Sequence, residues 1–508
     1  MLSLPSAGSM GGNMSLLFTT KANCRVSTYD VKCNNIEAVK SWAKNDKDTP
    51  EDQIRYFIGE EQLKPFVDSL VEGNEKRRRV LLLSLPHGPT VDKVIEQLGP
   101  LLKKDDIILD GGNEWWEETE RRQKWLKEKY GVIHLGLGVS GGYQSARHGP
   151  SMTPSGDKEA YEHVEPVLKA VAAQDPDSGE PCVGYIGGGG SGHHVKMMHN
   201  AIEQAILSSV CEVFDLLHWT LGWPAAEVAK VFKKWGGEGR PLEGNFLVEI
   251  GADIASRKEA AGTKDGKEEA AVDDIDDKVT QDVDDSEGTG VWGQKEWAGR
   301  HVAAPSIAIA HSLRIASSNK SERVKIAKKM GLPQPKKAVE WEGKSREEIE
   351  DTLEKVLYGA ALGAYVQGCN VIAAAEREQQ WGVSLENVIK IWRGGCIISS
   401  PGITRLLQSA YAQHPNVSNV MLVDEVAKEL AGTLEAHKET LVFAVESDAV
   451  VPTLGASMEY IKMSGVELLP TYFEESELDY FGTHQYDVRH EHKGEPEKGS
   501  YHEEWKPA

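Results

Sequence analysis

The sequence predicts an α/β protein: a doubly wound, mostly parallel sheet, followed by a large all-helical domain and a polar C-terminal tail. Two observations lead to this prediction. Over roughly the first 180 residues, short apolar runs that end in turn residues alternate with segments of helical spacing, as in strand–helix–strand repeats. Beyond residue 190 the apolar spacing stays helical over many turns.

Composition limits the class of protein. The 508 residues are enough for two or three domains, and 57 Lys and Arg against 79 Asp and Glu give a net charge of −22. This charge disfavours nucleic acid or an acidic membrane as the main partner. The six cysteines form no CxxC pair, and no run of 18 apolar residues and no secretory signal is visible. We therefore expect a soluble, cytoplasmic protein that spans no membrane.

The clearest strands lie in the N-terminal third. Residues 80–85 and 106–110 are short apolar runs that end in turn residues, as buried parallel strands do. The segment 90–104 between them has apolar residues at helical spacing. Residues 132–135 form another strand candidate, followed by a glycine-rich turn. These elements predict a doubly wound sheet of the Rossmann type.

A glycine turn near the start of the chain resembles a dinucleotide fingerprint. Gly8 and Gly11 match the second and third glycines of that motif, while Ser6 occupies the position of the first. The strand that should precede this turn has only five residues, and one of them is Pro5, which is a poor residue for a central strand. A first strand of reduced length is therefore expected.

The next strand, residues 25–30, ends in a carboxylate. Asp30 lies about 20 residues after the glycine turn, where an acidic residue binds the ribose 2′-hydroxyl. A carboxylate there repels a 2′-phosphate, so it favours NAD over NADP, although Lys32 could soften this preference. The alternative is that Asp30 is an ordinary turn residue at the end of a strand.

The remaining chain is predicted to consist of long helices and a tail. Helical spacing persists over residues 195–217, 346–375 and 424–450. The predicted domains are 1–189 (dinucleotide-binding), 190–466 (all-helical, substrate-binding and dimer-forming) and 467–508 (tail). Within the second, residues 257–287 are acidic and rich in small residues, which predicts a solvated excursion. The tail is either disordered or laid against another surface, and its aromatic residues favour a surface.

One predicted helix combines an apolar body with a polar stripe. Lys196, His199, Asn200 and Glu203 follow at i, i+3, i+4 and i+7, so they share one face. The other positions are apolar, so the helix is expected inside the protein. A buried Lys and Glu are costly unless they pair or line a site. The stripe is therefore either an internal ion pair or an active site with a base and an acid on one helix.

Two glycine-containing segments follow strands and belong to the same edge of the sheet. Residues 110–116 (DGGNEWW) and 139–151 (VSGGYQSARHGPS) come after strand candidates, where open α/β sheets bind ligands. Either segment alone could be a plain loop. Together with the Lys/Glu helix they predict one cleft. The 16 histidines show no metal-binding spacing, so no metal is expected.

These motifs, in this order, resemble the 6-phosphogluconate dehydrogenases, decarboxylating enzymes of the pentose phosphate pathway within the β-hydroxyacid dehydrogenases. The resemblance covers nearly the whole chain. It is carried by residues 8–14 (GSMGGNM), 110–113 (DGGN), 138–142 (GVSGG), 146–151 (ARHGPS), 192–200 (GHHVKMMHN), 288–292 (GTGVW), 392–398 (WRGGCII) and 479–484 (DYFGTH).

The resemblance implies oxidative decarboxylation of 6-phosphogluconate to ribulose 5-phosphate and CO2, with reduction of NAD or NADP. Lys196 would be the general base and Glu203 the acid that protonates C1. His484 would come from the partner subunit of a homodimer. The implied substrate-binding residues are Asn113, Ser140, Gly141, Gly142, His199, Asn200, Arg314 and His484, with Arg314 on the phosphate. The implied cofactor-binding residues are Gly8, Met10, Gly11, Asp30 and Asn113.

The departures from the family pattern fall mostly on phosphate binding. Gln204 replaces a Tyr, Glu287 a Lys and Leu478 an Arg, and each charge-assisted bond to phosphate contributes about 1.5–3 kcal/mol. Residues 29–31 (YDV) replace the Asn-Arg-Thr that binds the NADP 2′-phosphate, and Tyr143 replaces a frequent Glu.

Three hypotheses therefore stay open. The chain is a 6-phosphogluconate dehydrogenase with a rearranged phosphate site, or an NAD-dependent paralogue that acts on an unphosphorylated β-hydroxy sugar acid, or a non-catalytic nucleotide-binding pseudoenzyme. Retention of Lys196, Asn200 and Glu203 argues against the third, since an inactive protein has no need of an acid–base pair. The whole-chain resemblance favours the first.

Overall fold

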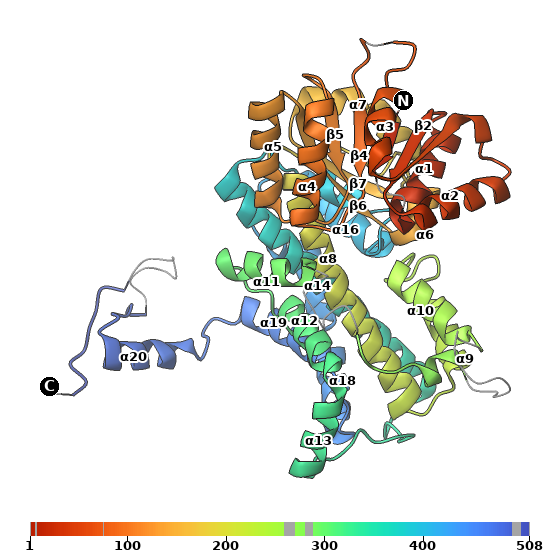
Figure 1. The fold of residues 1–508 in the computed structure, drawn as a ribbon. Coiled ribbons are helices and arrows are strands. Elements are labelled where there is room, and N and C mark those ends of the chain that lie inside the picture. The colour runs from red at the N-terminus through yellow and green to blue at the C-terminus, as the bar shows by residue number, and fades with distance from the viewer. Residues whose placement is uncertain are drawn as a thin grey trace. The chain divides into compact units, whose positions relative to one another are not determined.

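The N-terminal part of the chain forms a seven-stranded sheet with helices on both faces (Figure 1). The computed structural model describes residues 2–5, 8–74, 76–258, 270–279, 288–489 and 499–506. The strands are β1 (Leu2–Pro5), β2 (Val26–Asp30), β3 (Ile54–Ile58), β4 (Val80–Leu83), β5 (Ile107–Asp110), β6 (Ile133–Ser140) and β7 (Ser151–Ser155). Their order is β3-β2-β1-β4-β5-β6-β7. The predicted doubly wound α/β fold is confirmed.

The sheet is buried on both faces because β4 and β5 are apolar at every position except Asp110, the last residue of β5. Leu82 and Leu109 belong to a core on one face, whereas Leu81, Leu83 and Ile108 belong to a core on the other. The helices of this part are α1 (Ser9–Lys21), α2 (Cys33–Asn45), α3 (Leu63–Ser69), α4 (Pro89–Leu98), α5 (Trp116–Tyr130), α6 (Gly142–His148) and α7 (Lys158–Val171). Helices α1 and α7 contribute to the first core, and α3, α4 and α5 to the second.

The first strand is short, as predicted, and still occupies a central place. All four residues of β1 pair with β2, but only Leu2 and Ser3 pair with β4. Pro5 is the last residue of the strand and lies beyond the part that pairs with β4, so its missing N–H interrupts no pairing on that side. Ser6, the first position of the predicted fingerprint, lies outside the described residues.

Two strands were not predicted, β3 and β7. Residues 151–155 (SMTPS), of which only the first belongs to the predicted turn 139–151, form β7 antiparallel to β6 at the edge of the sheet. The other neighbouring strand pairs are parallel. Thr153 lies opposite Gly138, so β7 supplies a side chain close to the end of β6.

The rest of the chain is helical, as predicted. Its helices are α8 (Ser191–Asp215), α9 (Ala225–Trp235), α10 (Phe246–Ser256), α11 (Thr289–Gly299), α12 (Pro305–Ser318), α13 (Lys320–Met330), α14 (Arg346–Gln379), α15 (Leu385–Ile391), α16 (Pro401–Gln413), α17 (Asp424–Gly432), α18 (Leu434–Glu446), α19 (Pro452–Gly465) and α20 (Thr471–Gly482). By its contacts the chain divides into the units Met1–Met458 and Glu459–Ala508. The predicted boundary at residue 467 remains a prediction.

One expectation for the helical part needs correction, whereas the acidic excursion is mostly exposed where it is described. The helix expected over residues 424–450 is interrupted at Thr433, whose hydroxyl bonds back to the Leu430 carbonyl at 2.8 Å, and α18 begins at Leu434. In the acidic excursion, residues 270–279 contain a 3-10 turn (Ala271–Asp274). Asp273 and Asp277 there pair with His218 and Arg323, both at 2.7 Å. Residues 259–269 and 280–287 of the excursion lie outside the described residues.

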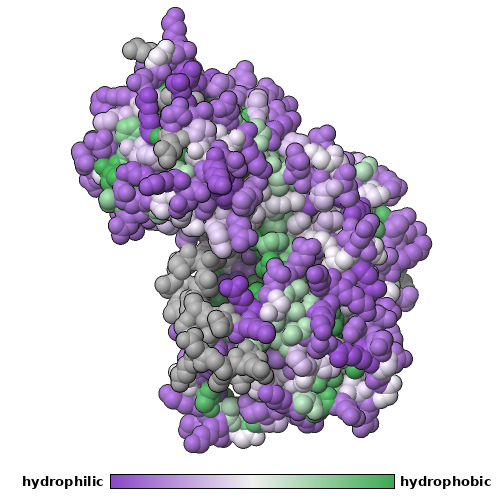
Figure 2. Space-filling model, turned by 90° about the vertical axis from the view of Figure 1, so that its right-hand side faces the viewer, coloured by the Kyte–Doolittle hydropathy of each residue, from purple (hydrophilic) through white to green (hydrophobic). Residues whose placement is uncertain are grey.

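The sequence contains no run of 18 apolar residues, yet α14 is long and apolar enough to cross a membrane by length and composition, the only such helix in the described ranges. Its apolar window is 89% buried inside the protein, as in a core helix. It packs along α8: an added Cβ at Gly368 would lie 2.4 Å from Ile202. Figure 2 shows hydrophilic residues over most of one face, in keeping with the charge of −22.

The tail folds on itself in the residues described. Asp479 on α20 is fully buried and accepts hydrogen bonds from Gln485 N at 3.0 Å and Trp505 Nε1 at 2.8 Å. His502 also lies 2.9 Å from this carboxylate, so one acidic side chain joins α20 to both later segments. Of the two alternatives for the tail, disorder does not hold for these residues.

A buried carboxyl group joins α8 to α19. Glu212 on α8 accepts the backbone N–H groups of Thr453 and Leu454, at 2.8 and 2.9 Å, in the first turn of α19. Burial raises the pKa of Glu212 to about 7, although these hydrogen bonds and that of Ser208 act in the opposite direction.

The raised pKa makes stability depend on pH. The folded protein holds the Glu212 proton more tightly than the unfolded chain, so this stabilisation is complete below about pH 4.5 and is lost as the pH rises through about 7. A difference of this size is worth about 3 kcal/mol. Urea unfolding between pH 5 and 8 should show that Glu212→Gln, which cannot ionise, loses this part of the pH dependence. Parallel curves for wild type and variant would contradict it.

Candidate active site

Helix α8 packs against the end of β6 at a short distance, which requires glycine at two positions. A Cβ added at Gly138 would lie 2.6 Å from the Cβ of Lys196 and 2.3 Å from Thr153 Oγ1. A Cβ at Gly192 would lie 2.1 Å from the Thr153 carbonyl oxygen. Real Cβ atoms do not approach so closely, so these glycines let α8 lie directly on β6 and β7. Lys196 is thereby held above the carboxyl end of the sheet.

The first turn of α8 is anchored by two buried histidines. His193 Nε2 donates to the Asp110 carbonyl at 3.0 Å, and its Nδ1 lies 2.7 Å from the hydroxyl of Thr119. Burial lowers the pKa of His193, which keeps the ring neutral, so Nδ1 accepts from Thr119. His194 Nε2 lies 2.7 Å from Glu296 on α11. The sequence analysis did not identify either anchor.

Glu296 binds three elements together. Besides His194 it accepts from Trp116 Nε1 at 2.9 Å and Arg300 Nε at 2.7 Å. Burial alone would raise the pKa of Glu296, but these neighbours lower it to about 2, so the carboxylate stays ionised. It therefore fixes α11 to the starts of α5 and α8.

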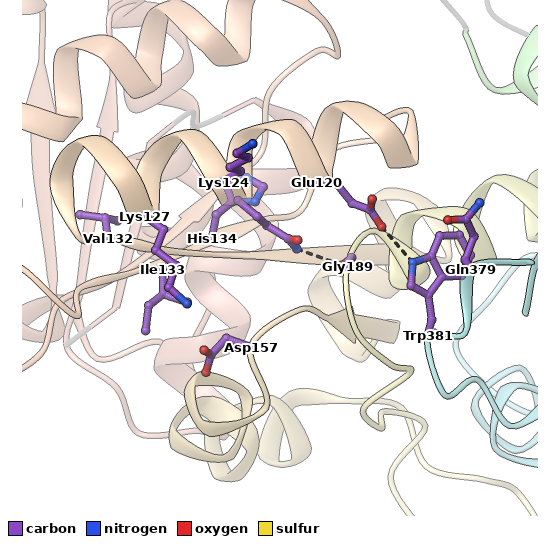
Figure 3. Close-up of a pocket in the computed structure, with 11 residues that line it drawn as sticks. Glu120, Lys124, Lys127, Val132, Ile133, His134, Asp157, Gly189, Gln379 and Trp381 are labelled. Carbon is purple, nitrogen blue, oxygen red and sulfur yellow. Dashed lines mark hydrogen bonds between the residues drawn. The ribbon is translucent and has the colours of Figure 1, made fainter.

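The glycine loop before α8 is held from its other side, beside the pocket drawn in Figure 3. Glu120 accepts from Gly190 N at 3.0 Å and from Trp381 Nε1 at 2.9 Å, and Gln123 donates to the Gly189 carbonyl at 2.9 Å. The pocket encloses about 610 Å³, and none of the predicted site residues lines it. The residues of its wall hold the start of α8 in place and are separate from the predicted catalytic residues.

The predicted polar stripe is buried as expected. Lys196 is 8% exposed and His199 1%, while Asn200 and Glu203 are half-buried. His199 Nδ1 lies 3.0 Å from Asn200 Oδ1 and 3.7 Å from the Glu203 carboxylate, and its Nε2 lies 2.8 Å from Ser140 Oγ. The structure thus brings together side chains of α8 and the end of β6.

The protonation of His199 follows from its surroundings. Burial, and then the charge of Lys196, lower its pKa well below the usual value, so the ring is neutral. The amide oxygen of Asn200 can only accept, so Nδ1 carries the proton and Nε2 accepts from the Ser140 hydroxyl. His199 therefore orients the side chains of Ser140 and Asn200. Lys196 is close enough to lower the pKa of His199.

The turn after β6 requires glycine conformations. Gly141 and Gly142 have φ of +102° and +66°, and a Cβ at Gly141 would lie 2.4 Å from the Gly395 carbonyl oxygen. That carbonyl accepts from Ser151 N at 3.0 Å. The 392–398 motif therefore packs directly against the 138–142 motif. The next residue, Tyr143, is exposed and belongs to α6.

Asn113 lies exposed in the loop after β5, at the same edge of the sheet. A Cβ at Gly111 would lie 3.0 Å from the Leu83 carbonyl oxygen, so this loop runs close to the end of β4. Asp110 is fully buried beneath it. Burial would raise the pKa of Asp110, but His134, His193 and Arg122 lower it to about 2.

The residues predicted for the dinucleotide lie at the ends of β1 and β2. Gly8 precedes the first turn of α1, Gly11 is buried in it, and half-buried Met10 packs against the core. A helix N-terminus at this point suits a pyrophosphate. Asp30 ends β2; its two oxygens accept from Lys32 N at 2.8 Å and Asn35 Nδ2 at 2.9 Å. Asp30 therefore holds the turn between β2 and α2. Its carboxylate lies at the end of β2, where the sequence predicts a ribose-binding acidic residue.

A second polar group lies one residue beyond Glu203. Gln204 and His311 approach each other over Gly290: a Cβ there would lie 3.1 Å from Gln204 Nε2 and 2.7 Å from His311 Nδ1. Buried Gln204 Oε1 and Thr289 Oγ1 have no hydrogen-bond partner within the described ranges, as is typical where a ligand binds. Sequence analysis missed His311, although it precedes Arg314 by one turn of α12.

Glu287 lies outside the described residues, and Leu478 and His484 belong to the unit Glu459–Ala508. Over the described ranges, no group of three or more His, Cys, Asp or Glu residues could hold a metal ion.

A doubly wound sheet with a glycine turn at α1, and with a buried Lys and His and a half-buried Asn and Glu at its carboxyl edge, is typical of the nicotinamide-dependent dehydrogenases. Family models give a closer assignment. The NAD binding domain of 6-phosphogluconate dehydrogenase matches residues 6–187, and the 6-phosphogluconate dehydrogenase C-terminal domain matches residues 192–505.

Individual proteins agree with these matches. The decarboxylating 6-phosphogluconate dehydrogenase of Emericella nidulans is 41% identical, over 98% of this chain and all of that one. The Spinacia oleracea enzyme 1 is 36% identical, over 98% and 95%. The Plasmodium falciparum 6-phosphogluconate dehydrogenase, solved in its apo form and with NADP+ or 6-phosphogluconate, superposes with a TM-score of 0.85 at 29% identity, covering 99% and 100%. The chain belongs to the 6-phosphogluconate dehydrogenase family.

The contact between Gly138 and Lys196 can be tested by adding one methyl group. Gly138→Ala should push Lys196 away from the sheet, lower the free energy of unfolding by about 1–3 kcal/mol and reduce kcat about 100-fold. Steady-state kinetics and urea unfolding measure both effects. Gly432→Ala, where an added Cβ meets nothing within 4 Å, is the matched control. Wild-type kcat in Gly138→Ala would show that the close approach does not position Lys196.

Proposed function

We propose that this protein catalyses the oxidative decarboxylation of 6-phosphogluconate to ribulose 5-phosphate and CO2, with reduction of a nicotinamide dinucleotide. The observation that supports this most is the buried polar face of α8 beside the Ser140 turn. A buried lysine and a half-buried glutamate on one rigid helix supply the base and the acid that the reaction needs.

Lys196 is the general base. It removes the proton from the C3 hydroxyl of the sugar acid, and, once protonated, it polarises the C3 ketone while the carboxylate leaves as CO2. The dinucleotide, when bound, supplies the hydride acceptor. Asp110 and Glu296 stay ionised, whereas His193 and His199 stay neutral, so the proton transfers fall to Lys196 and Glu203.

Glu203 is the acid. It gives a proton to C1 of the enediol that remains after CO2 has left. Seven residues of helix separate it from Lys196, which is about 10 Å along the axis, so the two groups reach different carbons of one substrate. It is half-buried and lies 3.7 Å from the neutral His199.

The other residues hold the substrate. Ser140, Gly141, Gly142, His199 and Asn200 bind the sugar acid through a hydroxyl, backbone N–H groups and an amide, together with Asn113. Arg314 binds the phosphate, and Gln204, Thr289 and His311 belong to the same end of the site. An amide and a hydroxyl there can donate to a phosphate but carry no charge, which also suits an unphosphorylated sugar acid.

The cofactor is proposed to be NAD. The carboxylate of Asp30 can accept hydrogen bonds from a ribose but repels a 2′-phosphate, and the next residue, Val31, offers no charge to bind one. In this respect the chain differs from what NADP, present in the Plasmodium falciparum structure, requires.

The functional unit is proposed to be a homodimer in the cytoplasm. Helices α12 and α13 carry exposed apolar side chains at Ile315, Val324, Ile326 and Met330. Exposed apolar side chains are available to a protein interface. On the same proposal, His484 completes the site of the partner subunit.

The function is tested by turnover of the purified protein with 6-phosphogluconate and with gluconate, each with NAD and NADP. Reduction of the dinucleotide together with CO2 release from 6-phosphogluconate supports the proposal. Activity on gluconate alone would identify a paralogue, and no turnover by folded, dinucleotide-binding protein would contradict an enzymatic function.

The cofactor proposal predicts that kcat/KM is at least about tenfold higher with NAD than with NADP, because a like charge faces the 2′-phosphate. The double variant Asp30→Asn/Val31→Arg should reverse this ratio. Initial rates with both dinucleotides measure it. If the wild type prefers NADP, the role assigned to Asp30 is wrong.

The base is tested by Lys196→Met, which keeps the length and apolar stem of the side chain. Turnover should fall by about 10³-fold or more, because proton removal then has no acceptor. The dissociation constant of the dinucleotide, measured by calorimetry, should stay unchanged. Near-normal turnover in this variant would exclude Lys196 as the base.

A further inference from the structure

Two loops that flank the candidate site are joined by a buried ion pair away from α8. Arg122 on α5 is fully buried and forms an ion pair with Glu114, whose side chain is 3% exposed. Glu114 follows Asn113 directly in the loop after β5. Neither Glu114 nor Arg122 has a role in the chemistry described above.

Both partners also bind the same backbone residue of the neighbouring loop. Arg122 Nη2 donates to the Gly88 carbonyl at 3.1 Å, and Glu114 Oε2 accepts from Gly88 N, also at 3.1 Å. The second oxygen of Glu114 accepts from Trp115 N at 2.9 Å. Gly88 has a φ of +81°, so it adopts a conformation that favours glycine, and α4 begins directly after it.

The residues next to this junction belong to the loops after β4 and β5. His87 precedes Gly88, and its ring packs edge-on against Trp292 of α11, with the ring centres 5.0 Å apart. Asn113 precedes Glu114. One ion pair therefore sets the backbone on both sides of the carboxyl edge between β4 and β5, where doubly wound sheets bind their ligands.

We propose that Glu114, held by Arg122, is a positioning residue that fixes the Asn113 and His87 loops and thereby sets the affinity for the dinucleotide and the sugar acid. The proposal rests on the proposed function, which gives Asn113 contacts to both. Burial of a fully bonded ion pair is costly, and its retention at this edge fits a need for fixed geometry.

Glu114→Gln removes the interaction without opening a cavity. Arg122 keeps Asp92 at 2.8 Å and Asp110 at 4.0 Å, so its charge stays compensated and the variant is expected to fold. A glutamine side chain has one acceptor oxygen and no charge, so it cannot serve Gly88 N, Trp115 N and Arg122 together, and the link between the two loops is weakened.

The sheet offers a matched control at its opposite edge. Arg79 and Asp106 form an ion pair at 3.1 Å with side chains 4% and 3% exposed, immediately before β4 and β5. It joins the same two strands at their amino ends. Asp106→Asn therefore disturbs an equally buried pair without touching the carboxyl edge.

The experiment measures Tm, the dissociation constants of NAD and NADP by calorimetry, and KM for 6-phosphogluconate in wild type, Glu114→Gln and Asp106→Asn. Both variants should lower Tm, but only Glu114→Gln should raise the dissociation constant of the preferred dinucleotide and the KM, each about tenfold. Unchanged values in Glu114→Gln, or equal rises in Asp106→Asn, would overturn the proposal. If wild type binds dinucleotide but does not turn over, the proposed function fails while the calorimetric comparison still tests the positioning role.

Discussion

The candidate active site depends on how closely α8 lies against the end of β6. A helix packed on a sheet normally leaves room for side chains between them, and here Gly138 and Gly192 remove that room. Lys196 is therefore buried at the carboxyl edge rather than exposed on a helix surface. Three hydrogen-bonding side chains also hold the helix in this position. His193, His194 and Glu120 fix the first turn of α8 to three different elements.

Burial also decides which groups near the site carry charge. His193 and His199 are held neutral, whereas Asp110 and Glu296 are held ionised by their partners. In a low-dielectric site, interactions among such fixed charges are stronger than they would be in water. The buried ion pairs cost free energy through desolvation, so their main role is to fix the positions of neighbouring elements and not to stabilise the fold.

Much of this was predictable from local sequence. The apolar runs before residues 85 and 110, the glycine turn at Gly8 and the spacing of Lys196 and Glu203 each follow from one element and its period. Motif order also gave the family. What could not be predicted arises between elements: Glu296 lies 102 residues from His194, and Gln204 meets His311 over a glycine. Strand β7 (SMTPS) was missed because it has no apolar run or regular alternation, and only its pairing with β6 makes it a strand.

The most direct test of this account is a crystal structure of the protein with 6-phosphogluconate bound. The account predicts the C3 oxygen within about 3 Å of Lys196 Nζ, C1 facing Glu203, and the hydroxyls bound by Ser140, His199 and Asn200. The phosphate should lie toward Arg314 and Gln204. A substrate bound elsewhere, such as in the pocket beside Glu120 and Trp381, or bound with C3 turned away from Lys196, would contradict it.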